Sequence, residues 1–142
     1  PGPGVLAAIE NADAVLLPPS NPVVSIGAIL AVPGIAEAVR ATSAPVVGVS
    51  GIVGGKPLRG MADACLAGIG VEATAAAVAR YYGARPAGIL DGWVVDDSDA
   101  ASVAEVEAAG IRCRATDTVM SDGLRAADVA HATLALALGL RP

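Results

Sequence analysis

Apolar residues in this chain gather in short runs, and the stretches between the runs repeat apolar positions every three or four residues. Four runs predict strands, at residues 13–17, 44–49, 88–95 and 111–115. The first two runs are apolar almost throughout, as expected of parallel strands covered on both faces. The fourth alternates Ile111, Cys113 and Ala115 with two arginines, so it should have one solvated face and lie at the sheet edge.

Helical patterns fill the intervals between the predicted strands. They predict helices at residues 5–12, 25–31, 34–41, 58–68, 74–82, 99–109 and 123–138. Ser98 is placed to cap the sixth helix, and Gly110 is placed to end it. The last helix has one predicted apolar face, formed by Leu124, Ala127, His131, Leu134 and Leu138.

Strands that alternate with helices predict an α/β fold, here a three-layer Rossmann-like domain with a mainly parallel sheet. The length of 142 residues suits one compact domain with its own core, and we expect residues 1–142 to form it. The apolar fraction of 54% comes mostly from Ala, Val, Leu and Ile, because the chain has one Trp, two Tyr and no Phe. The core should therefore consist of Ala-rich helices packed on β-branched strands.

The net charge of -5 argues against a nucleic-acid partner, because phosphate backbones attract basic surfaces. No apolar run reaches the roughly 18 residues that cross a bilayer, so we expect no membrane partner. The chain opens on Pro-Gly-Pro-Gly without an initiator Met or a basic signal start, which favours a cytoplasmic piece of a longer protein. Cys65 and Cys113 have no C-x-x-C pairing and are expected to be small buried residues.

Three loops that follow predicted strands have unusual compositions, and open α/β sheets bind ligands at such loops. The first loop spans residues 18–27, where three prolines restrict the backbone and Ser20, Asn21 and Ser25 offer polar groups. Ser25 stands at the predicted start of a helix, whose free amides form a natural anion site. The alternative is a plain Ser25 N-cap with Asn21 in an Asx turn, and composition does not decide between the two.

The second loop, residues 50–60, combines glycines with cations. Gly54 and Gly55 would let backbone amides approach a phosphate, and Lys56 and Arg59 would add positive charge. The loop is not a P-loop, because Pro57 stands where the magnesium-binding Ser or Thr would be, and a serine replaces the first glycine. The alternative is a flexible glycine turn with solvated cations.

The third loop, residues 116–122, carries short polar side chains. Thr116, Asp117 and Thr118 could hold a base, a sugar or a metal through its waters. Equally, the loop could cap the final helix, with Asp122 near the positive end of the helix dipole.

Two other polar features indicate structure rather than chemistry. The acids Asp96, Asp97 and Asp99 lack the spacing of a calcium loop and precede a helix, where negative charge is favoured. His131 is the only histidine and lies on the predicted apolar face, so core packing is favoured over catalysis.

Several segments together resemble the 2-phospho-L-lactate transferases (phosphoenolpyruvate transferases) that build coenzyme F-420. Residues 19–34 are similar to the family's GPSNP-x-x-SIG-x-IL-x-VPGI stretch, and residues 50–63 to its SPI-x-GG-x-x-L-x-G-x-AD segment. Residues 90–96 are similar to LDG-x-V-x-D, and residues 116–120 to TDT-x-M. These motifs occur in the family's order and span nearly the whole chain, which makes the resemblance specific.

The resemblance implies a transferase that passes a phospholactate or phosphoenolpyruvyl group from a guanosine diphospho-donor to the deazaflavin Fo and releases GMP. It also implies assistance by Mg²⁺ and a homodimer. Donor phosphate or flavin groups would contact Ser20, Asn21, Ser25 and Gly27. The diphosphate would be neutralised by Gly54, Gly55, Lys56 and Arg59. The nucleotide side would be lined by Thr116, Asp117 and Thr118. The resemblance assigns no catalytic residue.

The family begins with a Gly-rich strand, loop and helix whose acidic residues are expected to hold magnesium. The sequence corresponds to the C-terminal portion of the larger transferase, so we expect no metal ligands in it and expect the chain alone to lack part of the active site; whether it is active alone stays open. Two alternatives stay open: a non-catalytic module that binds a nucleotide or anion, and a fragment that serves dimerisation through its Ala-rich helices.

Overall fold

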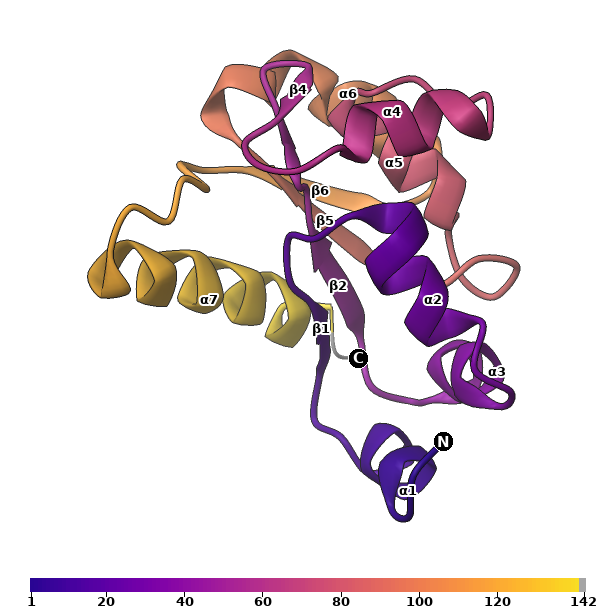
Figure 1. Cartoon of the computed structure of the whole chain (residues 1–142). Helices are drawn as coiled ribbons and strands as arrows, with labels where there is room; N and C mark the ends of the chain where they lie inside the picture. Colours follow the sequence, from indigo (N-terminus) through magenta and orange to yellow (C-terminus); the bar gives the residue numbers. More distant parts are fainter. Residues whose placement is uncertain (141–142) are drawn as a thin grey trace.

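The computed structural model describes residues 1–140 and shows a parallel sheet between two unequal helical layers (Figure 1). The strands lie in the order β1-β2-β5-β6, and their bounds are β1 Val15–Leu17, β2 Val46–Val49, β5 Gly92–Val95 and β6 Arg112–Ala115. All three pairings are parallel, with Val15 opposite Val46, Val47 opposite Gly92 and Trp93 opposite Cys113. The predicted Rossmann-like α/β fold is confirmed, and β6 lies at the predicted edge.

Spatial order follows chain order, so right-handed crossovers place the connecting helices on one face of the sheet. These elements are η1 Pro22–Ile26, a π-helical turn, α2 Gly27–Leu30, α3 Ile35–Ala41, α4 Ala62–Gly68, α5 Ala75–Tyr82, η2 Asp97–Ser102, a 3-10 turn, and α6 Val103–Ala108. The first helix, α1 Val5–Glu10, packs against α3. The last helix, α7 Gly123–Leu138, returns across the opposite face and contacts β2 and β5 (Figure 1).

The main core lies between the sheet and the crossover helices, and Trp93 is its largest side chain. Trp93 is 1% exposed, donates from Nε1 to the carbonyl of Ala75 at 3.1 Å, and meets the ring of Tyr82 edge-on. Its ring fits because the neighbouring strand has a glycine: a Cβ on Gly48 would lie 2.5 Å from the Trp93 ring. The glycine in β2 therefore serves packing.

Replacing Gly48 by Ala should lower the free energy of unfolding by about 1–3 kcal/mol, because the added methyl overlaps a ring held by its own hydrogen bond. Urea unfolding followed by Trp93 fluorescence would measure the loss. A Gly48→Ala protein as stable as the wild type would show that Trp93 can shift without cost.

The prediction of which face of α7 is buried is wrong. The side chains buried against the sheet are Val129, Thr133 and Ala137. The predicted face, formed by Leu124, Ala127, His131, Leu134 and Leu138, is exposed. The cause is the alanine content of the helix, because small apolar residues on every side let hydrophobic periodicity fit two opposite faces equally well.

Three predicted helix starts also need correction. The segment predicted from residue 99 begins at Asp97, and its N-cap is Asp96 instead of Ser98. The first helical segment after β1 begins at Pro22 with Asn21 as its N-cap, so Ser25 lies inside η1 instead of at its start. The helix predicted from residue 58 begins only at Ala62, because residues 58–61 form bends that follow a short hairpin. This hairpin consists of β3 Ile52–Val53 and β4 Lys56–Pro57, and the periodicity does not predict it.

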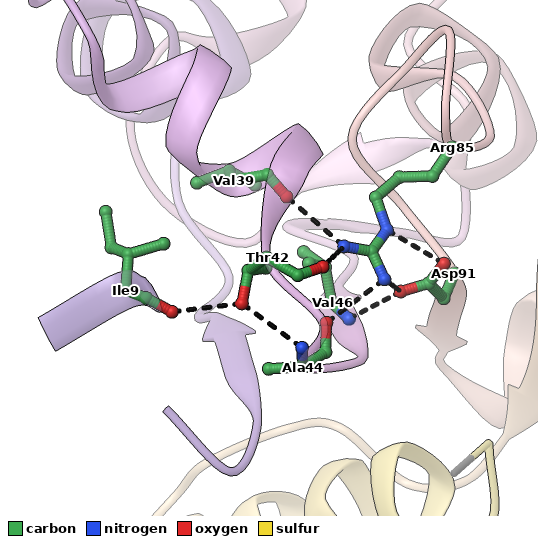
Figure 2. Close-up of polar contacts among 7 residues, drawn as sticks. All are labelled: Ile9, Val39, Thr42, Ala44, Val46, Arg85 and Asp91. Atoms are coloured by element: carbon green, nitrogen blue, oxygen red, sulfur yellow. Dashed lines mark hydrogen bonds and ion pairs between the residues drawn. The ribbon is translucent and has the colours of Figure 1, made fainter. Parts of the chain in front are cut away.

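At the amino-terminal edge of the sheet, one guanidinium connects several segments (Figure 2). Arg85 donates to three backbone carbonyls: Val39 at 3.3 Å, Thr42 at 2.7 Å and Ala44 at 3.0 Å. It also pairs with Asp91, with Nε 2.9 Å from Oδ1, and the Asp91 Oδ2 accepts from the Val46 amide at 2.7 Å. This tether, Arg85 with Asp91, fixes the end of α3 and the start of β2 against the loop before β5.

Within residues 1–140, no single helix is long and apolar enough to span a membrane; only Pro22–Leu30 together with Ile35–Ala41 reach that size, across an 83° bend. Cys65 and Cys113 are free and half-buried, so the prediction of small packed residues is close. Burial, with a smaller contribution from the charge of Glu107, raises the pKa of the Cys113 thiol to about 11. At neutral pH this thiol is protonated and unreactive.

Candidate functional site

The three loops singled out in the sequence meet at the carboxyl-terminal edge of the sheet, where they surround a pocket of about 460 Å³. Ser20 and Asn21 come from the first loop, Arg59 from the second and Thr118 from the third. The convergence follows from topology, because parallel strands end at the same edge and deliver their following loops together. The structure therefore brings four predicted site residues into one cavity.

The other predicted site residues do not line this pocket; they are Ser25, Gly27, Gly54, Gly55, Lys56, Thr116 and Asp117. A cavity of about 500 Å³ also lies at the opposite edge of the sheet, beside Arg85 and Asp91. In that cavity Arg85 and Asp91 are engaged in their tether, and none of the predicted site residues lines it. The carboxyl-terminal pocket, which four of them line, is therefore the candidate site.

The first loop presents Asn21 in a fixed orientation. Its Oδ1 accepts from the amides of Val23 at 2.9 Å and Val24 at 3.1 Å, and its Nδ2 donates to the Cys65 sulfur at 3.4 Å. An amide nitrogen has two hydrogens, so one of them remains for a ligand in the pocket. Asn21 thus combines the predicted Asx-type turn with a place in the pocket wall.

Packing is tight at two glycines of these loops. A Cβ on Gly27 would lie 2.8 Å from the Pro22 carbonyl oxygen, inside the turn of η1. A Cβ on Gly51 would lie 3.1 Å from the carbonyl oxygen of Ser20, where the first and second loops touch. Gly51 therefore lets two walls of the pocket approach each other.

The glycines of the second loop form the tip of the β3–β4 hairpin. Gly54 and Gly55 have φ values of 58° and 77°, the conformation of a two-residue type I′ turn. The Gly54 amide donates to the Asp99 carboxylate at 2.9 Å, so it is already engaged. Lys56 is exposed on the hairpin, and Arg59, just beyond it, is the cation that lines the pocket.

The third loop is fixed by a buried carboxylate. Asp96 is 7% exposed and accepts four hydrogen bonds: the Ser98 amide at 3.0 Å and hydroxyl at 2.7 Å, and the Thr118 amide at 2.9 Å and hydroxyl at 3.1 Å. Burial opposes the ionisation of Asp96, but the hydrogen bonds from Thr118 and Ser98 outweigh it and hold its pKa below the usual range. Thr118 is thereby held in the pocket wall by both of its polar groups.

The rest of this loop caps and anchors α7, as the alternative interpretation predicts. Asp122 accepts at Oδ1 from the amides of Leu124 and Arg125, each at 2.9 Å. These bonds, the one from Arg125 first, hold the pKa of Asp122 below its usual range. Asp117 accepts from the Val119 amide at 3.0 Å and lies 3.4 Å from Arg125.

Replacing Asp96 by Asn should cost about 1.5–3 kcal/mol of the free energy of unfolding at pH 7, because bonds to a charged acceptor are lost. The folded pKa of Asp96 is lowered, so its contribution is present above the unfolded pKa of about 3.9 and disappears as pH falls through the folded value. Urea unfolding between pH 7 and pH 3 should therefore show the difference from wild type shrinking in acid. The exposed neighbour is the control, and Asp97→Asn should change stability by less than about 0.5 kcal/mol.

Two features of the site lie outside the sequence prediction. The first is its apolar lining, which includes Val53, Leu58, Val119 and Met120. These residues adjoin the predicted polar ones in the same loops. A prediction that included the apolar residues of each loop would therefore have named them. The second is η2, where the N-cap Asp96 holds the third loop and Asp99, inside the turn, holds the hairpin. The partners of these two acids are distant in sequence and give no local signal.

Neither a metal cluster nor an aromatic platform is assembled in the described part of the chain. No group of three or more His, Cys, Asp or Glu residues within residues 1–140 is placed to hold a metal ion. Trp93 is 1% and Tyr82 is 8% exposed, so neither can stack on a ligand. Tyr81 is exposed but lies beside Glu72 and Arg80, away from the candidate pocket.

Comparison with known proteins shows which family this chain is similar to. The sequence model of the family described as 2-phospho-L-lactate transferase CofD matches residues 1–133. The chain is 60% identical to phosphoenolpyruvate transferases of Streptomyces griseus and Kitasatospora aureofaciens over 141 residues, which is 99% of this chain and 43% of each relative. It is 57% identical to that of Thermobifida fusca, covering 41% of it. The chain thus spans less than half the length of these curated relatives.

Proposed function

This chain belongs to the 2-phospho-L-lactate transferase family, and on that basis we propose that it carries part of the active site of a transferase in coenzyme F-420 biosynthesis. The proposed reaction moves a phosphoenolpyruvyl or phospholactyl group from a guanosine diphospho-donor to the deazaflavin Fo and releases GMP. The relatives are named phosphoenolpyruvate transferases, which favours phosphoenolpyruvate as the transferred group. We place the enzyme in the cytoplasm and propose a homodimer as its assembly.

The observation that carries this proposal is that the three loops described in the sequence analysis, which resemble the family's motifs, converge on one pocket. Phosphoryl transfer depends mainly on positioning and on neutralising the charge of the transferred group. Arg59 supplies a cation at the pocket, Asn21 a directed amide, and Ser20 an exposed hydroxyl. Lys56 stands on the adjoining hairpin and adds positive charge beside the site.

The apolar part of the pocket fits the acceptor. Leu58, Val119 and Met120 are 56%, 40% and 44% exposed and lie at the lining of the same cavity. A deazaflavin is a flat heteroaromatic ring system, and burying such a ring against aliphatic side chains is favourable. Its hydroxyl side chain would then lie near the polar side of the pocket.

Magnesium enters the proposal as a requirement of the whole enzyme. Within residues 1–140 the acidic residues do not cluster into a cation site, so the described residues do not fit Mg²⁺ by themselves. We assign no step of the reaction to a metal held by this chain.

Calorimetric titration with GDP, with and without Mg²⁺, tests the proposal. Saturable binding should weaken about tenfold in Asn21→Ala and in Arg59→Ala, because each removes a directed polar group or charge. Arg40→Ala is the control, since Arg40 is exposed on α3 and does not line the pocket. Equal binding by all three variants, or none by the folded chain, would contradict the pocket assignment. Turnover of Fo with the guanosine donor, assayed with the family's N-terminal segment restored, then separates a transferase from a binding module.

A further inference from the structure

The last helix has apolar side chains on two opposite faces. Val129, Thr133 and Ala137 are buried against the sheet. On the other side of the helix, Leu124 is 81% exposed, Leu134 is 38% and Leu138 is 47%. With Ala127 and His131 between them, these leucines follow alternating steps of three and four residues, the spacing at which one helix packs along another. We call the residues Leu124, Ala127, His131, Leu134 and Leu138 the α7 stripe.

The last seven residues of α7 have no polar side. Residues 132–138 read Ala-Thr-Leu-Ala-Leu-Ala-Leu, and their one polar side chain, Thr133, is buried and donates to the Val129 carbonyl at 2.7 Å. A helix that is apolar all round is normally surrounded by protein. The end of the stripe formed by Leu134 and Leu138 therefore has the composition of a buried helix face while it is exposed in this chain.

The sheet is also incompletely covered on the α7 side. In the part of the chain that the structure describes, α7 is the helix that covers this face, whereas the crossover helices share the other (Figure 1). Val15 and Leu17 pack into the main core, so Leu16 between them faces the α7 side, where it is 37% exposed. Among residues 1–140, β1 pairs only with β2, and its second edge is open. Parallel sheets normally have both faces covered, and open edges are usually protected.

We propose that the α7 stripe is the docking surface for a helix from the part of the family's polypeptide that this chain does not span. The relatives are more than twice as long as the matched segment, so they have enough additional chain to cover the stripe. Additional polypeptide from the same protein could also cover Leu16 and pair with the open edge of β1. This surface lies on another part of the fold from the nucleotide pocket, and the proposal does not depend on the proposed chemistry.

A single chain in which residues 1–142 replace the matched segment of the Streptomyces griseus enzyme tests this proposal. The double variant Leu134→Gln/Leu138→Gln should lower the Tm of that chimera by more than about 5 °C, because it places two amides in a packed helix interface. In the 142-residue chain, the same change should lower Tm by less than about 2 °C, because both side chains are partly solvated.

Ile69→Gln is the matched control, because Ile69 is 45% exposed and follows α4 on the other face of the sheet. It should have the same small effect in both proteins. An equally small effect of the stripe variant in both proteins would overturn the proposal. Sedimentation gives the other decisive result: if the 142-residue chain self-associates and the stripe variant makes it monomeric, the occupant is a second copy. GDP binding by the stripe variant should match the wild type. A wrong docking proposal can therefore be told apart from a wrong assignment of the candidate pocket to a nucleotide.

Discussion

Replacing Arg85 by Met is expected to lower the free energy of unfolding by about 3 kcal/mol, the lower end of the range for breaking a buried ion pair. The side chains of Arg85 and Asp91 are only 15% and 25% exposed, so water compensates little for the lost guanidinium. The change leaves Asp91 without its cation and removes the donor from the carbonyls of Val39, Thr42 and Ala44. Urea unfolding at pH 7 measures the loss.

Arg80 provides the control for this prediction. It pairs with Glu105 between α5 and α6, but the two side chains are 43% and 56% exposed. Exposed pairs contribute little, so Arg80→Met should cost less than about 1 kcal/mol. If the two variants lost equal free energy of unfolding, the Arg85 tether would contribute no more to stability than an exposed ion pair.

The strand positions could be predicted because they depend on local composition. Runs such as Val46–Val49 are buried on both faces and stay apolar, while the alternating arginines of Arg112–Ala115 identify the edge strand. The α7 face could not be predicted, since alanines make both faces fit the helical period. The hairpin could not be predicted either, because the strands on the two sides of Gly54-Gly55 have only two residues each and are too short to show a period.

The location of the candidate site could be predicted, whereas most contacts within it could not. Loop composition and parallel topology place three loops at one edge, and Asn21, Arg59 and Thr118 do line a common pocket. The partners of these loops come from distant positions: Thr118 binds a carboxylate 22 residues away, and Gly54 one 45 residues away. Such pairs leave no local pattern, and the same holds for Arg85, whose carbonyl partners are 41 to 46 residues away.

Replacing Gly88 by Ala should destabilise the chain by at least about 3 kcal/mol, because the new methyl would meet backbone rather than a movable side chain. A Cβ on Gly88 would lie 2.2 Å from the carbonyl carbon and 2.3 Å from the carbonyl oxygen of Gly83. That oxygen also accepts from the amides of Ile89 at 3.0 Å and Leu90 at 2.9 Å, so moving it breaks the turn.

The turn between Gly83 and Gly88 includes Arg85, so damage to it should also displace the tether. Gly88→Ala and Arg85→Met should therefore be less than additive, and a double-mutant cycle in urea would show the coupling. Gly68→Ala is the control: Gly68 is helical in α4, and a Cβ there has no atom within 4 Å. It should stabilise the chain by about 0.5–1 kcal/mol. If the losses of unfolding free energy in Gly88→Ala and Arg85→Met were additive, the turn would keep its shape independently of the Arg85 guanidinium.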